Sequence, residues 1–119
     1  MHDDTTLLGL TNGYTVRELR IGPRSWMAHR RLDELDLPEE GVTLLALRRA
    51  NGEFIGAPRH DIELHPRDTL ILYGRAEPLS EIGTRQSGSA GDKAHLNAVD
   101  AHRRGALDQV RRDHPREAH

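Results

Sequence analysis

The sequence has no cysteine, few aromatic residues and no long hydrophobic run. Without cysteine, disulfides, thiolate metal sites and a cysteine nucleophile are all excluded, and this composition suits a cytosolic protein. One Trp, one Phe and two Tyr leave a small apolar core in a chain of 119 residues, of which 30% are charged. A core of this size favours pairing with a second copy. We therefore predict a single domain that forms a homodimer.

An excess of charge of one sign is also lacking, because the formal net charge is −2 and both signs are interspersed. This balance gives no general attraction to nucleic acid or anionic lipid, so we expect no nucleic-acid partner. No apolar run approaches the roughly 18 residues that a membrane-spanning helix needs. The first residues, Met1 to Asp4, are acidic where a signal peptide is basic, so we expect a soluble chain.

The apolar residues that are present concentrate between Gly41 and Gly74, together with the clearest turn signals. Residues 42–47 are apolar at nearly every position, which predicts a central strand covered on both sides. Alternation would place Val42, Leu44 and Ala46 on one face and Leu45 and Leu47 on the other. The pair Asn51-Gly52 favours a two-residue type I′ turn that leads into a further strand at residues 53–55.

Further strands and a proline turn complete the predicted sheet. Ile62 and Leu64 alternate as in a half-buried strand, and residues 69–73 form the last strand. Between them, the segment His65-Pro66-Arg67-Asp68 has proline where a type I turn favours it. Residues 14–21 are predicted as the first strand, with either a bulge or cover on both faces, because their apolar residues change parity.

Helices are predicted before and after the central region. Residues 26–35 fit one short helix, with Ser25 as its N-cap and Pro38 beyond its end. Pro78 fits the first turn of a second helix that ends at Gly83.

The remaining sequence predicts little further structure. Residues 84–92 are polar and rich in glycine and serine, which indicates a flexible linker. Residues 93–112 have a weak, broken apolar stripe, so we expect a marginal, solvated helix; binding of a partner by this helix is the alternative. Removal of everything after Gly83 should leave folding and dimerisation nearly unchanged. The predicted division is a connector at 1–13, a folded domain at 14–83, and a linker with a partly helical tail at 84–119.

A set of motifs between residues 14 and 82 is typical of one protein family. The set comprises Glu18-Leu19 in the first strand, the segment Trp26 to Pro38 with its Leu35-to-Pro38 ending, Gly41 before the second strand, Arg48-Arg49 before the Asn-Gly turn, and PRDTLILYG at 66–74. Together these features resemble the TrkA-C domain, also called the C-terminal domain of regulators of potassium conductance (RCK-C). The family usually has glycine where this chain has Arg67, so we expect that turn to keep ordinary φ values while Asp68 still caps it.

The resemblance implies an α+β fold, a small β-α-β-β-β-α unit that dimerises. It also implies a regulatory domain that senses a small ligand or ion for a potassium channel or cation transporter, in the same chain or in a separate subunit. In several members the cleft between two copies holds cyclic di-AMP. These features imply a cytoplasmic location at the inner face of the cell membrane. Members usually carry a preceding Rossmann domain, but no GxGxxG motif follows a predicted strand, so we expect no NAD or ATP binding of that kind.

Arginines carry the hypothesis of a phosphate-bearing ligand. Guanidinium groups hold phosphates through paired hydrogen bonds, and the segments that the family uses around its dimer cleft contain Arg24, Arg30, Arg31, Arg48 and Arg49. We select Arg31 and Arg48 as anion ligands. The apolar walls for the bases of a dinucleotide would be Leu35, Leu37, Val42 and Leu44. The alternatives are solvated arginines and a structural dimerisation module that binds no ligand.

Metal binding and catalysis have weaker support. The best-spaced histidines are His60 with Asp61 and His65, and His95 with His102, and neither set is a recognised ligand pattern. The acidic pairs at 33–34 and 39–40 fit a solvated face better than acid–base catalysis, and no serine lies in a nucleophile-elbow motif. We therefore predict no metal site and no enzyme activity.

Overall fold

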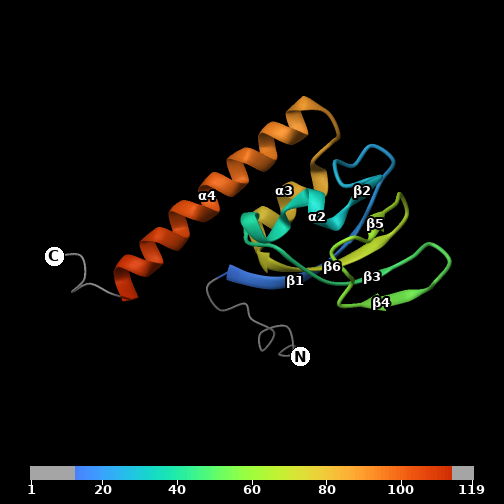
Figure 1. The fold of residues 1–119 in the computed structure, drawn as a ribbon, viewed down its shortest axis with the longest axis horizontal. Coiled ribbons are helices and arrows are strands. Elements are labelled where there is room, and N and C mark those ends of the chain that lie inside the picture. Colours follow the sequence, from blue (N-terminus) through green and yellow to red (C-terminus); the bar gives the residue numbers. More distant parts are fainter. Residues whose placement is uncertain (1–12, 114–119) are drawn as a thin grey trace.

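The main structural unit is a four-stranded antiparallel sheet, seen in a computed structural model that describes residues 13–113, with side chains as far as residue 107. In spatial order the strands are β1 (Tyr14–Arg20), β6 (Thr69–Arg75), β3 (Thr43–Arg48) and β4 (Phe54–Gly56). The helical elements are α2 (Leu32–Leu35), the 3-10 helix η2 (Leu37–Glu40), α3 (Ala76–Thr84) and α4 (Ser89–Asp113). Helices α2, α3 and α4 all lie on one side of the sheet (Figure 1).

The core lies between the sheet and these helices. Leu70 and Leu72 of β6 are fully buried, whereas Ile71 and Tyr73, which point to the opposite face, are only partly buried. Leu79 and Ile82 of α3 pack on this face over β1 and β6 and form the other side of the core. This alternation along β6 is the period-two pattern of a strand with one covered face. The predicted α+β architecture is confirmed.

A bulge in β3 changes which residues face the core. Leu44 pairs with Leu72 and Ala46 pairs with Ile71, so Leu45 is the additional residue between two regular stretches. The prediction that Val42, Leu44 and Ala46 share one face is wrong, because an added residue inverts the alternation after it. Leu45 is 42% exposed, so in a single copy β3 is not covered on both faces as predicted.

The predicted helix at residues 26–35 is also wrong in most of its length. Only α2 is helical, and before it Arg30–Arg31 forms strand β2, which pairs with β5 (Glu63–Leu64) in an antiparallel ribbon. The backbone N–H groups of His29 and Leu32 donate to the carbonyls of Leu64 and Ile62, both at 2.8 Å, so pairing with the ribbon replaces the helical bonds. Ser25 is not a helix cap, since its Oγ accepts from the N–H of Met27 within a turn.

Two turns differ from prediction in their backbone conformation. The N–H of Arg49 donates to Glu53 O at 2.8 Å, which closes a three-residue loop, and only Gly52 within it has a positive φ, of 92°. The two-residue type I′ prediction is therefore wrong, and the loop matches the longer hairpin class. Arg67 has a φ of 75°, so it keeps the left-handed conformation that glycine favours, contrary to expectation. Asp68 does cap this turn, because its Oδ2 accepts from the N–H of His65 at 2.9 Å.

The polar segment after α3 is held against the domain. Gln86 forms a β-bridge with Ser25, the carbonyl of Arg85 accepts from the N–H of Trp26, and α4 already begins at Ser89. The expected flexible linker at 84–92 is therefore wrong, although the domain end at Gly83 stays a prediction. Glycine at 91 serves a close approach, since a β-carbon there would collide with the Gln86 carbonyl and lie 2.6 Å from Trp26 Cδ1.

Helix α4 runs along one side of the molecule for 25 residues (Figure 1). It packs on η2, where His102 lies against Gly41 and Arg103 pairs with Glu39 at 3.3 Å. Among the described side chains of α4, Val99 is the most buried large residue, at 9% exposure. Among the described helices, none has an apolar stretch long enough to cross a membrane.

Candidate functional site

A hollow of about 310 Å³ opens between the short helices and β3, and we call it the α2–β3 hollow. Its lining combines apolar side chains with two acidic residues and one histidine: Leu32, Asp33, Asp36, Leu37, Pro38, Thr43, Leu44 and His60. The hollow exists because Asp36, with a φ of 49°, ends α2 after one turn and redirects the chain into η2. A volume of this size is at the lower end of small-molecule sites.

Asp33 concentrates the polar interactions at the rim of the hollow. Its Oδ1 accepts from Arg31 Nε at 3.1 Å, and its Oδ2 lies 3.6 Å from His60 Nδ1. Its backbone N–H donates to the carbonyl of His60 at 2.7 Å, which ties the His60 turn to α2. The rim therefore has one carboxylate between two basic side chains.

The face of the sheet that points away from the helices is a second candidate surface, which we call the outer sheet face. Tyr14 and Tyr73 stack there at 5.7 Å between ring centroids. Leu45 and Phe54 are 42% and 61% exposed. Exposed apolar side chains gathered on one flat face are typical of a protein–protein contact.

The structure separates the six residues predicted to bind a ligand. Leu35, Leu37 and Val42 have no exposed surface, because they pack in the core. Leu37 and the half-buried Leu44 both line the α2–β3 hollow, and Arg31 approaches the hollow through Asp33.

Arg48, the sixth predicted ligand residue, lies at the outer sheet face. There it faces Glu18 at 3.4 Å, and the Arg48 side chain is 44% exposed. A single copy of the chain therefore does not bring Arg31 and Arg48 together.

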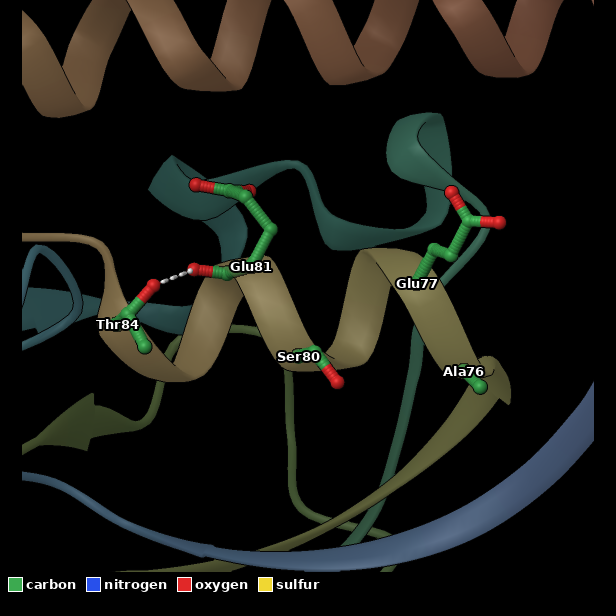
Figure 2. Close-up of a pocket in the computed structure, with 5 residues that line it drawn as sticks. All are labelled: Ala76, Glu77, Ser80, Glu81 and Thr84. Carbon is green, nitrogen blue, oxygen red and sulfur yellow. Dashed lines mark hydrogen bonds between the residues drawn. The ribbon is translucent and has the colours of Figure 1, made fainter.

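A shallow depression of about 520 Å³ also follows α3, lined by Ala76, Glu77, Ser80, Glu81 and Thr84. Figure 2 shows Glu77 and Glu81 pointing toward the same side of the helix, while Ser80 points to the other side. Two carboxylates along this depression repel phosphate, so it does not suit an anionic ligand.

Sequence reasoning missed a buried charged cluster around Trp26, which we call the Trp26 cluster. The Arg85 guanidinium donates to both carboxylate oxygens of Glu40, at 2.9 and 2.8 Å, and both side chains are 1% exposed. Glu81 is a second partner of Arg85, and the guanidinium also lies 4.6 Å from the Trp26 ring centroid. Burial lowers the pKa of Arg85, but the hydrogen bonds and charges of Glu40 and Glu81 outweigh it and raise that pKa above its ordinary value.

Helix α4 completes the Trp26 cluster. The His95 ring stacks on Trp26 at 5.0 Å, and His95 Nδ1 contacts Glu40 Oε2. Trp26 Nε1 donates to Asp92 Oδ1 at 3.0 Å. The only signal for this cluster in the sequence is the single tryptophan, because the charged members lie far apart along the chain.

Comparison with known proteins gives one family match. Residues 16–85 match the TrkA-C domain, which is more than half of the chain. No curated protein matches the chain.

Solved structures give two informative similarities. One is the RCK C domain of the potassium transport protein KtrA in complex with cyclic diadenosine monophosphate, at 28% identity and a TM-score of 0.53, covering 66% of this chain and 89% of that one. The other is the GsuK channel bound to NAD, at 23% identity and a TM-score of 0.50, covering 60% of this chain. The match takes in only 13% of the GsuK chain, so this chain corresponds to a small part of that channel.

Proposed function

Since the chain belongs to the TrkA-C domain family, we propose that it is a ligand-sensing regulatory domain of a potassium channel or cation transporter. The observation that carries this proposal is the similarity to the RCK C domain of KtrA, which was solved with cyclic di-AMP. The membrane-embedded partner is either part of the same protein or a separate subunit. Either arrangement places the domain in the cytoplasm at the inner face of the cell membrane.

The proposed ligand is cyclic di-AMP or a similar small anion, held between two copies of the chain. A cyclic dinucleotide has two phosphates related by a two-fold axis, so one set of side chains repeated by dimer symmetry meets both. The ligand would change the relative orientation of the copies, and this change would be transmitted to the cation pathway.

The residues proposed for this ligand are those with accessible side chains. Among the described residues Arg48 pairs with the exposed Glu18 and Arg31 pairs with Asp33, so each guanidinium can exchange a carboxylate for a phosphate. Leu44 contributes an apolar wall from the α2–β3 hollow. Leu37 lines the hollow beside Leu44, although its own surface is fully buried in this conformation, and Leu35 and Val42 support this wall from the core.

Calorimetric titration of the chain with cyclic di-AMP tests the proposal. Replacing Arg48 or Arg31 with alanine should weaken binding more than tenfold, because a hydrogen bond to a charged group contributes about 1.5–3 kcal/mol. Arg59→Ala is the matched control, since Arg59 is an exposed arginine that pairs with Asp61, away from the α2–β3 hollow lining. Equal binding by wild type, Arg31→Ala and Arg48→Ala would place the ligand elsewhere.

A structural dimerisation module without a ligand is the second candidate function. It is favoured by the exposed Leu45 and Phe54 on the outer sheet face and by the full burial of three predicted ligand walls. Under this function the chain is a dimer by light scattering and shows neither heat nor a thermal shift with cyclic di-AMP. A monomer that binds cyclic di-AMP would refute it.

A further inference from the structure

Three donor side chains from two separated segments meet on the surface of the β2–β5 ribbon. Ligand atoms of His29, Glu63 and His65 all lie within 4.8 Å of one another. His65 Nδ1 is 3.7 Å from Glu63 Oε2, and the His29 and His65 rings are 6.3 Å apart between centroids at an angle of 71°. Donors around a tetrahedral Zn²⁺, at 2.0–2.2 Å from the ion, are roughly 3.3–3.6 Å apart. Side-chain rotations that move the ligand atoms by about 1 Å would therefore bring all three within bonding distance of one ion.

The pairing of the ribbon places these side chains together. Arg30 pairs with Leu64, so the antiparallel register extended by one residue sets His29 opposite His65. The N–H of His29 donates to the carbonyl of Leu64 at 2.8 Å, which fixes this end of the pairing. Glu63 and His65 are two residues apart on an extended segment, so their side chains leave from the same face.

A partly buried ion pair fixes the backbone of two of the three residues. Arg49 Nη1 donates to the carbonyl of Glu63 at 2.9 Å, and Asp68 Oδ2 accepts from the N–H of His65 at 2.9 Å. Arg49 and Asp68 pair with each other at 2.6 Å, and the Asp68 side chain is 3% exposed. The Arg49 charge is thus balanced by Asp68, so Arg49 does not neutralise the Glu63 carboxylate, which can act as an anionic ligand.

His29 adopts a backbone conformation that favours glycine or asparagine. Its φ is 65°, in the left-handed region. Strained conformations of this kind persist where the surrounding structure holds them and are concentrated at functional sites. The conformation brings the imidazole over β5 and its two other donors.

We propose that His29, Glu63 and His65 bind a divalent transition-metal ion of the Zn²⁺ class, with water in the fourth position. Two imidazole nitrogens and one carboxylate suit Zn²⁺, Co²⁺ or Ni²⁺, whereas Ca²⁺ and Mg²⁺ prefer oxygen ligands. The spacing of these residues along the chain does not indicate the set, because His29 is far from Glu63 in sequence. The best-spaced histidine set in the sequence, His60 with Asp61 and His65, does not form a metal cluster of this kind, because His60 faces Asp33 instead.

Metal binding at this position would tie the loop before β2 to β5. The neighbouring Arg30 lies over Trp26 at 5.0 Å and pairs with Asp92 of α4 at 3.5 Å. The metal would therefore stabilise the ribbon on which the start of α4 rests, independently of any nucleotide ligand.

Titration of the full chain with Zn²⁺ by calorimetry, and with Co²⁺ by visible absorption, tests the proposal. Wild type should bind one equivalent and gain thermal stability with Zn²⁺. His29→Asn, Glu63→Gln and His65→Asn should each weaken binding at least about tenfold, since even indirect partners of a metal contribute 10–100-fold. Asparagine tolerates the left-handed region, so His29→Asn should keep the fold, which its melting curve without metal checks.

His60→Asn is the matched control, because His60 is an exposed histidine outside the set. It should bind Zn²⁺ as wild type does. Failure of the wild type to bind would overturn the proposal. Binding that survives all three substitutions, or that His60→Asn weakens equally, would overturn it too, since the ion would then lie on other histidines. None of these outcomes depends on cyclic di-AMP.

Discussion

Arg85→Met offers a quantitative test of how the Trp26 cluster stabilises the fold. The substitution keeps most of the aliphatic volume but leaves Glu40, whose side chain is 1% exposed, without its paired hydrogen bonds. Removing one partner of a buried ion pair costs about 3–5 kcal/mol. For a domain of this size that loss lowers the melting temperature by about 10–20 °C. Because domains have only about 5–15 kcal/mol of stability in total, the variant should be close to unfolding at physiological temperature.

Urea denaturation of wild type and variants measures this free energy directly. Arg103→Met is the control. Like Arg85, Arg103 pairs with a glutamate of η2, but its side chain is 68% exposed, and an exposed pair contributes about 0–1 kcal/mol. The double variant Arg85→Met/Glu40→Leu should recover much of the loss, because it removes the buried charge as well. If Arg85→Met lowers the free energy of unfolding no more than Arg103→Met does, then water or another side chain satisfies the Glu40 carboxylate, and the Trp26 cluster does not stabilise the fold as proposed.

Three further predictions concern α4 and the outer sheet face. Removing residues 84–119 should lower the free energy of unfolding by about 3 kcal/mol or more, because Glu40 loses Arg85 and Trp26 loses its cover. An unchanged denaturation midpoint would instead support a flexible linker at 84–92. Gly91→Ala should lower the free energy of unfolding by about 1–3 kcal/mol in urea denaturation, because the added methyl group collides with Trp26. Gly105→Ala is the control in the same helix: its methyl group meets open space, so it should raise the free energy of unfolding by about 0.5–1 kcal/mol. Leu45→Lys should shift the chain toward monomer by light scattering while leaving circular dichroism unchanged, and an unaffected dimer would exclude the outer sheet face as the interface.

Local patterns in the sequence predicted most of the sheet because strand periodicity and proline turns are properties of neighbouring residues. The strands at 14–20 and 69–75 and the helix that contains Pro78 follow directly from such patterns. The helix predicted at 26–35 failed because hydrogen bonds to residues 60–64 outweigh a weak local helical preference.

The candidate sites were less predictable for a related reason. The Arg85–Glu40 pair joins residues 45 positions apart, and the His29–Glu63–His65 set joins two segments through the register of a short ribbon. Neither the polar composition around Arg85 nor the spacing of the histidines indicates these contacts. The bulge at Leu45 likewise depends on how β3 meets β6, and it decides which leucines reach the outer sheet face.

Helix α4 is held near its N-terminal end, which gives it the geometry of a lever. Among the side chains that the structure describes, its contacts with the rest of the fold fall between Gly91 and Arg103. From Arg103 to the end of the helix at Asp113 the axis extends about 15 Å, at 1.5 Å per residue. A tilt of about 10° about this attachment would therefore move the far end by about 3 Å, roughly half a helical turn. A small change in how α4 packs on η2 would thus be largest at the C-terminal end of the helix.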